Sequence, residues 1–415
     1  MKTTPRLITD TVLFALNNNP VVFVNGPRQA GKSTLVQSLA RTDYPADYVS
    51  FDNVTQMAAA AASPVSFLKM RKGALIIDEV QMVPELFRAL KAVVDEIRMT
   101  DKPHSNGRFL LTGSANIMAL PKLSEPLVGR MSIKTLYPFS GSEATGGKGE
   151  FLSSLFAADF FDLPKASLAL NDVIRLATFP EISGKKMRER SEWFDGYLTT
   201  ILQRDVRVLS ELDKISLLPV LLRILATRAG NLINDADIAR DVALNPVTSK
   251  SYRAILQAMF LTFSIEPWYR NIGKRLVKSS KGYLTDTLLL CHLLDWQLED
   301  IQSRKPDLYG HVVENFVATE LLKLLSFNEV RAQLLHFRTS DNKEVDFVLE
   351  RPDGSLAAIE VKSSDTVDAR AFKGLKILKE AAPDDFVCGI VLYAGDEVVP
   401  FGDDLFAVPF AALWQ

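Results

Sequence analysis

The sequence predicts an α/β protein that begins with a parallel β-sheet, and three observations support this fold class. An apolar run at residues 21–24 leads into Gly26-Pro-Arg-Gln-Ala-Gly31-Lys32-Ser33, which fits the phosphate-loop pattern G-x-x-x-x-G-K-[ST]. A second apolar run at 74–77 ends in Asp-Glu, and a third within 108–114 ends in small polar residues. Wholly apolar strands between helical patterns are typical of buried parallel sheets. We therefore expect a phosphate-binding α/β domain over residues 1–150.

The elements between these strands are predicted in order along the chain. Residues 1–20 read as a helix that ends at Asn-Asn-Asn-Pro. A helix over 34–41 continues from the phosphate loop, and a strand follows at 48–51. The alanine-rich stretch 57–63 favours a helix, for which we expect only a surface or supporting role. Pro84 then opens a helix whose apolar residues recur at helical spacing.

Composition limits the classes of protein to consider. The chain has 415 residues, 47% of them hydrophobic, with a net charge of −2, which predicts two to four domains and no overall basic field. Nucleic-acid contact would therefore need a local basic patch. Two distant cysteines, Cys291 and Cys388, argue against a disulfide framework or a cysteine zinc site. With no signal-peptide pattern and no apolar run of about 18 residues, we expect a soluble, cytoplasmic protein without a membrane segment.

The phosphate loop predicts ATP and Mg²⁺ as ligands. Gly26 and Gly31 allow backbone N–H groups to point at phosphate oxygens. Lys32 is expected to reach the β- and γ-phosphates and Ser33 to supply a hydroxyl to Mg²⁺, with the N-terminus of the following helix facing the anion. The full set of expected ATP-binding residues in the loop is Gly26, Pro27, Arg28, Gln29, Ala30, Gly31, Lys32, Ser33 and Thr34.

The acid pair Asp78-Glu79 extends this prediction from binding to hydrolysis. A buried parallel strand that ends in two acids presents them at the nucleotide crevice. Asp78 would hold Mg²⁺, directly or through water, and Glu79 would orient or deprotonate the attacking water. Without the upstream loop, the same two acids would be an ordinary strand end that caps a turn.

Two further residues are candidates for the ATP site. The strand within 108–114 is expected beside the strand that ends at Asp78, so Ser114 or Asn116 would sense the γ-phosphate; the alternative is a simple polar turn. Arg130 would complete a positive clamp on the transferring phosphoryl group or is an ordinary surface residue. Whether it would act within its own subunit or across an interface is also open.

The glycine-rich stretch Gly141–Gly149 is the clearest break in composition and predicts the end of a domain or an insertion. We expect a helical linker and a winged-helix-like domain over 151–310, and a last domain over 311–415. Within 217–285, three helical patterns precede two strand-like runs that flank a basic turn, which contains Arg270, Lys274, Arg275 and Lys278. This order is that of a winged helix. Contact with DNA and a role as a packing module between domains are both open interpretations.

The last domain carries a second candidate site. A helix from His311 contains Glu314, and two hairpin-like strands follow it, at 344–349 and 356–362. Side-chain alternation places Asp346 on one face of its strand, and Glu360 and Lys362 on one face of the next. Carboxylates and a lysine so placed can hold Mg²⁺ and activate water for phosphodiester cleavage. The pattern predicts a nuclease-like fold and leaves cleavage itself open.

Several motifs together resemble a known family. GPRQAGKST, LIIDEVQ and LLTGSAN are similar to the motifs of AAA-type P-loop ATPases, and the stretch 127–143 resembles the subgroup with a C-terminal domain of unknown function 4143. Residues 197–205 and the tail EVDFVLE…AIEVKSS resemble that domain, whose fold is similar to restriction endonucleases. Val345-Asp346 stands where Pro-Asp is common. The resemblance implies an α/β P-loop NTPase with an AAA-type parallel sheet, then a helical/winged-helix domain, then a restriction-endonuclease-like α/β domain.

Three functional hypotheses follow. The first is a Mg²⁺-dependent ATPase that couples hydrolysis to a DNA-related activity through residues 217–285 and 311–415. The second is a DNA nuclease regulated by ATP. The third is a non-catalytic switch that binds a protein partner or another copy of itself in a nucleotide-dependent way. A small-molecule kinase is disfavoured because Glu79 beside Asp78 suits water activation.

Overall fold

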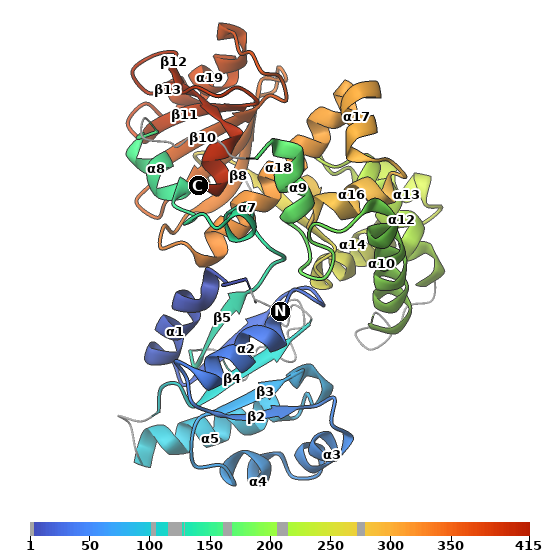
Figure 1. Ribbon diagram of the computed structural model, residues 1–415, viewed down its shortest axis with the longest axis vertical. Helices are drawn as coiled ribbons and strands as arrows, with labels where there is room; N and C mark the ends of the chain where they lie inside the picture. Colours follow the sequence, from blue (N-terminus) through green and yellow to red (C-terminus); the bar gives the residue numbers. More distant parts are fainter. Residues whose placement is uncertain are drawn as a thin grey trace. The chain divides into compact units, whose positions relative to one another are not determined.

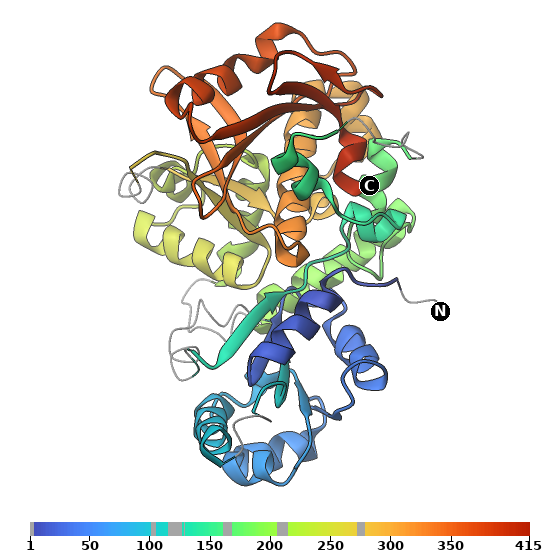
Figure 2. The same cartoon turned by 90° about the vertical axis from the view of Figure 1, so that its left-hand side faces the viewer.

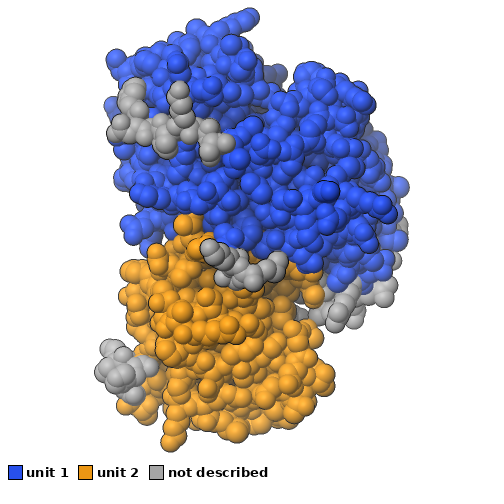
Figure 3. Space-filling model, viewed as in Figure 1, with its two compact units in different colours: residues 1–4, 139–257, 261–415 blue, residues 5–138, 258–260 orange. Residues whose placement is uncertain are grey.

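The computed structural model describes residues 4–100, 105–114, 127, 129–160, 168–205, 215–271 and 279–415. The chain forms two compact units, shown in different colours in Figure 3. One comprises residues 5–138 with 258–260, here called the N-terminal unit, and the other comprises 1–4, 139–257 and 261–415, here called the C-terminal unit. The domain boundaries predicted at 150 and 310 stay predictions.

The N-terminal unit is built on five parallel strands in the order β2-β3-β4-β1-β5. The strands are β1 (Val21–Asn25), β2 (Asp47–Ser50), β3 (Leu75–Asp78), β4 (Phe109–Gly113) and β5 (Met131–Thr135). Every residue of β1, β3 and β4 is buried. The apolar runs in their sequences predict this burial. The predicted parallel α/β sheet is confirmed.

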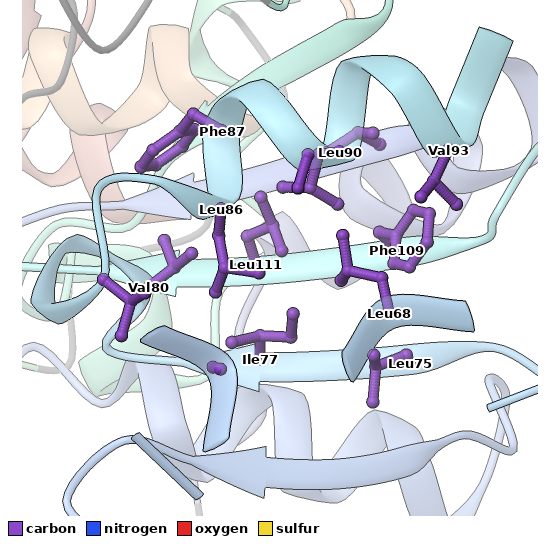
Figure 4. Close-up of a cluster of buried hydrophobic side chains, with 14 of the residues drawn as sticks. Leu68, Leu75, Ile77, Val80, Leu86, Phe87, Leu90, Val93, Phe109 and Leu111 are labelled. Atoms are coloured by element: carbon purple, nitrogen blue, oxygen red, sulfur yellow. The ribbon is translucent and has the colours of Figure 1, made fainter. Parts of the chain in front are cut away.

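Helices pack on this sheet through apolar residues at helical spacing. They are α1 (Ile8–Asn18), α2 (Lys32–Arg41), α3 (Val54–Ala62), α4 (Pro64–Lys69) and α5 (Leu86–Thr100), with a short 3₁₀ turn at Val80–Met82. Leu86, Leu90 and Val93 of α5 lie in the same buried cluster as Ile77 of β3 and Leu111 of β4 (Figure 4). Through this cluster, α5 packs against β3 and β4. The packing fixes the positions of their carboxyl ends and of the side chains that follow them.

The C-terminal unit contains a mixed sheet of eight strands in the order β12-β13-β11-β10-β9-β8-β6-β7. The strands are β6 (Thr262–Pro267), β7 (Lys281–Leu284), β8 (Gln333–Arg338), β9 (Glu344–Glu350), β10 (Leu356–Val361), β11 (Phe386–Tyr393), β12 (Val399–Pro400) and β13 (Leu405–Pro409). β8, β9 and β10 are antiparallel neighbours, as predicted. The hairpin of β6 and β7, assigned to a separate domain in the sequence prediction, joins this sheet because β6 pairs with β8.

The helices of the C-terminal unit lie beside this mixed sheet, and several of them gather together to one side of it (Figure 1). They are α7 (Gly141–Thr145), α8 (Phe151–Ala157), α9 (Leu170–Leu176), α10 (Met187–Thr200), α12 (Leu218–Thr227), α13 (Asp235–Asp241), α14 (Pro246–Ala258), α16 (Thr287–Leu293), α17 (Leu298–Arg304), α18 (Pro306–Phe327) and α19 (Lys373–Ala381), with a π-helical turn at Ile201–Asp205 and 3₁₀ turns at Ile215–Leu217, Ala369–Phe372 and Phe410–Trp414. α18 contacts β7 and β10, and α19 contacts β9, β10 and β11; Figure 2 shows the same sheet from a second side. Across the described part of the chain, no helix combines the length and the apolar character that a membrane crossing requires.

The stretch Gly141–Gly149, predicted as the end of a domain or an insertion, follows residue 138, where the chain leaves the N-terminal unit. Ser140 and Glu143 form a reciprocal capping box that starts the helix α7, and Gly141 to Glu143 are buried. A Cβ on Gly147 would lie 2.0 Å from the carbonyl oxygen of Trp414. Here glycine allows two backbones to approach closely, so Gly147 packs directly against the 3₁₀ turn Phe410–Trp414.

Candidate functional site

Three strand ends meet at one edge of the parallel sheet. β3, β4 and β1 are neighbours in that order, and Asn25 at the end of β1 pairs with Gly113 at the end of β4. The phosphate loop follows β1, Asp78 ends β3, and Ser114 directly follows β4. The carboxyl ends of parallel strands face the same side of a sheet, where ligands bind in α/β folds. The sheet therefore brings the loop, the acid pair and Ser114 to one place.

The phosphate loop requires glycine at both ends. Gly26 has φ of 144°, and a Cβ there would lie 2.1 Å from the carbonyl oxygen of Leu136. Gly31 has φ of 95° at the start of α2, and Gln29 between them has φ of 60°. Backbone that turns in this way can direct N–H groups into an anion-binding nest. The loop has the backbone shape that its sequence predicts.

Lys32 is a buried cation whose hydrogen-bond acceptors among the described residues are loop carbonyls. Its side chain donates to Gly26 O at 3.0 Å and to Pro27 O at 2.7 Å. Burial lowers the pKa of Lys32 to about 8, although Glu79 and Asp78 act in the opposite direction. Removal from water disfavours the charged form unless a negative group compensates. A bound anion at the loop would therefore stabilise this ammonium.

Asp78 is buried at the end of β3, and hydroxyl groups satisfy both of its oxygens. The Tyr48 hydroxyl donates to Oδ2 at 2.7 Å, and the Thr112 hydroxyl donates to Oδ1. Burial and the hydrogen bond to Asp78 raise the pKa of Tyr48 to about 12, so the phenol keeps its proton. Neither Tyr48 nor Thr112 was predicted as a site residue from the sequence, although both lie in predicted strands beside the acid pair.

Glu79 lies in a left-handed backbone conformation, with φ of 60°, which is uncommon for a residue with a side chain. Its Oε2 accepts hydrogen bonds from the Ser114 hydroxyl at 3.3 Å and from the Gln81 amide. Gln81 also donates to the Ser114 hydroxyl at 3.1 Å. Ser114 therefore contacts the proposed water-activating acid. Gln81, which the sequence analysis did not select, orients the same carboxylate.

Arg130 lies elsewhere on the sheet. It directly precedes β5, and its carbonyl oxygen accepts a hydrogen bond from the N–H of Val21, the first residue of β1. Its guanidinium forms a bidentate pair with Asp95 of α5, at 2.6 and 3.0 Å. This is the opposite edge of the sheet from the phosphate loop, about 16 Å away along β1. The structure does not bring Arg130 to the loop of its own chain, so only a role across an interface stays a prediction.

The residues at the carboxyl edge fit a Mg²⁺–triphosphate. Ser33 and Thr34 are in the first turn of α2, half-buried and exposed respectively. Mg²⁺ in nucleotide sites keeps several waters and uses one or two protein oxygens together with substrate phosphates. Ser33 and Asp78 are the groups expected to provide those oxygens. The donor set thus suits a metal that arrives with its nucleotide, and the described residues contain no group of three or more His, Cys, Asp or Glu side chains able to hold a metal.

The second predicted site contains a residue that the sequence analysis missed. Glu314 of α18 and Asp346 of β9 approach each other, but the ammonium of Lys281 lies between them. Lys281 Nζ is 3.1 Å from Glu314 Oε1 and 3.2 Å from Asp346 Oδ1, and Asp346 Oδ2 accepts from the N–H of Val361 at 2.9 Å. Burial followed by the charge of Asp346 raises the pKa of Glu314. The three side chains form a buried ion triad.

Glu360 and Lys362 form a separate pair beside this triad. Lys362 Nζ donates to Glu360 Oε1 at 2.7 Å, whereas Glu360 Oε2 is buried and has no hydrogen-bond partner in the described part of the chain. Burial, with Asp346 next in importance, raises the pKa of Glu360. Both residues line a pocket of about 440 Å³, whose rim includes Lys343, Arg370 and Lys373. The four predicted nuclease residues are therefore neighbours. They do not form a single group of metal ligands.

The remaining candidate region, 217–285, has the predicted elements α12, α13, α14, β6 and β7. Leu232 also forms an isolated bridge with Lys281 on the outer side of β7. Arg270 is exposed, whereas Lys274, Arg275 and Lys278 lie outside the described residues, as does Asn116. Their contact with DNA or nucleotide stays a prediction.

Comparison with known families divides the chain into three matched regions. The family described as "AAA domain" matches residues 18–145, a domain of unknown function (DUF8612) matches 168–300, and a domain of unknown function (DUF4143) matches 309–413. The first region includes the whole phosphate loop and acid pair, and the last includes Glu314, Asp346, Glu360 and Lys362.

Individual relatives extend the likeness over nearly the whole chain. The uncharacterized proteins Rv2008c of Mycobacterium tuberculosis and Mb2031c of Mycobacterium bovis are each 30% identical over 397 residues, which is 95% of this chain and 81% of theirs. Among solved structures, the Walker-type ATPase paby2304 of Pyrococcus abyssi is 13% identical, with 69% of this chain and 94% of that chain covered and a TM-score of 0.42. Cdc6p of Pyrobaculum aerophilum is 12% identical, with 77% and 96% covered and a TM-score of 0.27.

Proposed function

Because this chain belongs to the family of AAA-domain proteins that carry the C-terminal domain DUF4143, we propose that it is a Mg²⁺-dependent ATPase that couples hydrolysis to an activity on DNA. The ATPase part rests above all on Lys32, a buried ammonium without a carboxylate partner among the described residues, at the same sheet edge as Asp78 and Glu79. Such an ammonium is suited to receive a phosphate group.

The proposed mechanism assigns one task to each group at this edge. Lys32 and the loop N–H groups bind the phosphates and stabilise the charge that develops on the transferring phosphoryl group. Glu79 accepts a proton from the attacking water, or orders that water for in-line attack. Gln81 and Ser114 hold the Glu79 carboxylate in one orientation. Mg²⁺, where bound, supplies positive charge to the phosphate oxygens.

Two substitutions separate binding from hydrolysis. Lys32→Ala should abolish binding of a fluorescent ATP analogue, because the loop loses its buried cation. Glu79→Gln should retain that binding and lower phosphate release by roughly 10²–10⁴-fold, the usual contribution of a general base. Glu85→Gln is the matched control, since Glu85 is an exposed glutamate six residues further along. Wild-type phosphate release from Glu79→Gln would remove Glu79 from the mechanism.

The segment that leaves the N-terminal unit is tied to the phosphate loop. Leu136 N–H donates to Asn25 O at 2.8 Å. The guanidinium of Arg6 joins the loop to the same segment, since it donates to Ala30 O at 2.7 Å and to Tyr137 O at 2.6 Å. A change in the loop on nucleotide binding would therefore act directly on residues 136–137.

The same segment is anchored again after it enters the C-terminal unit. Lys323 of α18 donates to Phe139 O at 2.9 Å, and Glu320 of α18 accepts from Gly141 N–H at 2.7 Å. α18 also carries Glu314 of the second site. These two anchors lie either side of Pro138, and they support the proposal that the nucleotide state is transmitted along 136–141 to the C-terminal unit.

The DNA part of the proposal is supported by the surface of α14. Its exposed residues include Val247, Lys250, Ser251 and Ala254, which recur at helical spacing and include no acid. A helix with small side chains and a lysine along its exposed face can enter a major groove and contact phosphates. We propose that this face binds duplex DNA.

Lysine substitution tests this face. Lys250→Ala should weaken duplex binding across all sequences and lower the salt slope of binding by about 1. Lys376→Ala is the matched control, because Lys376 is an exposed lysine on α19, away from the proposed face. ATP turnover measured with and without duplex DNA then tests coupling. Absence of binding to any nucleic acid at low salt would favour the alternative, a nucleotide-dependent switch that binds a protein partner.

A further inference from the structure

The carboxylate cluster of the DUF4143 domain encloses a cation from outside that domain, the ammonium of Lys281. We propose that Lys281 takes the place of a divalent metal between Glu314 and Asp346, so that the tail holds no Mg²⁺ there. The ammonium lies 3.1 Å from one carboxylate oxygen and 3.2 Å from the other, in the bridging position that a metal shared by these two acids would need. This proposal concerns the C-terminal unit alone and is independent of ATP turnover.

Lys281 is fixed in this position by its backbone on both sides. It begins β7, pairs with Ile265 of β6, and forms a bridge with Leu232 on the other side. The next residue, Gly282, exchanges backbone hydrogen bonds with Gly230 and Asn231. The Lys281 side chain is only 3% exposed. It is therefore a built-in part of the sheet and not a surface lysine that has folded inward.

Neighbouring side chains close the cluster around the ammonium. The Tyr283 hydroxyl donates to Glu314 Oε1 at 2.7 Å, so this oxygen already accepts two hydrogen bonds. Asn315, the next residue of α18, forms hydrogen bonds with both the N–H and the carbonyl of Leu284 and so holds β7 against the helix.

The backbone of Gly230 occupies the other side of the Glu314 carboxylate. A Cβ at Gly230 would lie 3.1 Å from both Glu314 oxygens. A hydrated Mg²⁺ needs six oxygens in near-octahedral order. The backbone on one side and the ammonium on the other leave no such arrangement.

The charges of the cluster also disfavour a metal between Glu314 and Asp346. Three carboxylates, Glu314, Asp346 and Glu360, face two ammonium groups, Lys281 and Lys362. A divalent ion in contact with Glu314 and Asp346 would lie against the Lys281 ammonium in a buried place, where like charges repel strongly. Glu314 and Asp346 therefore do not fit, between them, the metal that a restriction-endonuclease-like fold implies.

Mn²⁺ binding to the full-length, nucleotide-free protein tests the proposal by isothermal titration calorimetry. Wild type and Asp346→Asn should give the same isotherm, because neither holds a metal between residues 314 and 346. Lys281→Met should gain one Mn²⁺ site per chain, and Lys281→Met/Asp346→Asn should lose it. Any Mn²⁺ at the phosphate loop is common to all four proteins and cancels in the comparison.

Lys362→Met is the matched control, because it removes a lysine from the same cluster and leaves Lys281 in place; it should gain no site. A wild-type Mn²⁺ site that disappears in Asp346→Asn would overturn the proposal. So would the absence of a new site in Lys281→Met, or an equal gain in Lys362→Met. If Lys281→Met does not fold, the wild-type and Asp346→Asn isotherms still decide whether the wild-type protein binds Mn²⁺ through Asp346.

Discussion

Replacing Lys323 with Met should strongly destabilise the C-terminal unit. The Lys323 ammonium donates to Phe139 O at 2.9 Å, to Ala177 O at 3.1 Å and to Glu320 Oε1 at 2.9 Å. Its side chain is 3% exposed, and that of Glu320 is fully buried. Methionine keeps the apolar stem but removes all three hydrogen bonds, so the substitution isolates the charge and its contacts.

The magnitude follows from the groups left behind. The buried carbonyl of Ala177 and the partly buried carbonyl of Phe139 lose a donor, and one buried carboxylate loses its counter-ion. Removal of one partner from a buried ion pair costs about 3–5 kcal/mol, a large share of the roughly 5–15 kcal/mol that stabilises a domain. Lys323→Met/Glu320→Gln should recover part of this loss, because it leaves no unpaired buried charge.

The cost should also depend on pH. Burial raises the pKa of Glu320 above its ordinary value of 4.5, and Lys323 opposes that rise. Without Lys323 the folded-state pKa rises further. Stability from an acid whose folded pKa is raised is present below the unfolded pKa and is lost as pH rises through the folded pKa. The deficit of Lys323→Met should therefore grow from about pH 4.5 upward.

Urea denaturation followed by tryptophan emission measures this loss. All four tryptophans, at positions 193, 268, 296 and 414, lie in the C-terminal unit, so the signal reports this unit alone. Lys376→Met, an exposed lysine on α19, is the control and should change stability little. A Lys323→Met transition that coincides with that of Lys376→Met would falsify the assignment of Lys323 as a buried anchor.

Two further predictions concern a glycine and a histidine. Gly26→Ala should abolish ATP-analogue binding, because its Cβ would meet Leu136 O at 2.1 Å and its φ of 144° is strained for alanine; normal binding would show that the loop can move aside. Burial and then Lys281 lower the pKa of His336 from 6.5 to about 4, so wild-type stability should fall as pH drops from 6.5 towards 4, by about 3 kcal/mol from this group. His336→Asn should lose less over the same range in urea titrations, and equal losses would contradict this assignment.

The parallel sheet was largely predictable because its signals are local. The apolar run at 74–77 and its two acids predicted a buried strand, and the structure has β3 at Leu75–Asp78. Burial of both faces of a parallel strand demands continuous apolar sequence, so the pattern appears within a few residues. The hydrogen-bond partners of Asp78 could not be predicted from a local pattern in the sequence. Tyr48 and Thr112 are 30 and 34 residues away, and only sheet order brings them together.

The second site depends on contacts between residues that are far apart in the sequence. Side-chain alternation along the predicted hairpin indicated Asp346, Glu360 and Lys362 as site residues. Glu314 was added because it lies on the helix predicted before that hairpin. Lys281 was missed because it was assigned to another domain, 33 residues before Glu314 and 65 before Asp346. No local pattern marks a lysine as the partner of two distant acids.

By itself, the sequence determined the phosphate loop, the acid pair and the strands that carry them. These features depend on backbone preferences and on residues that are contiguous, so short patterns specify them. Only the tertiary structure decided that Arg130 pairs with Asp95 far from the loop, that the hairpin of β6 and β7 belongs to the C-terminal sheet, and that Lys281 lies between two acids. Each of these depends on which distant surfaces pack together, because a buried charge takes whichever counter-charge the packing brings within reach.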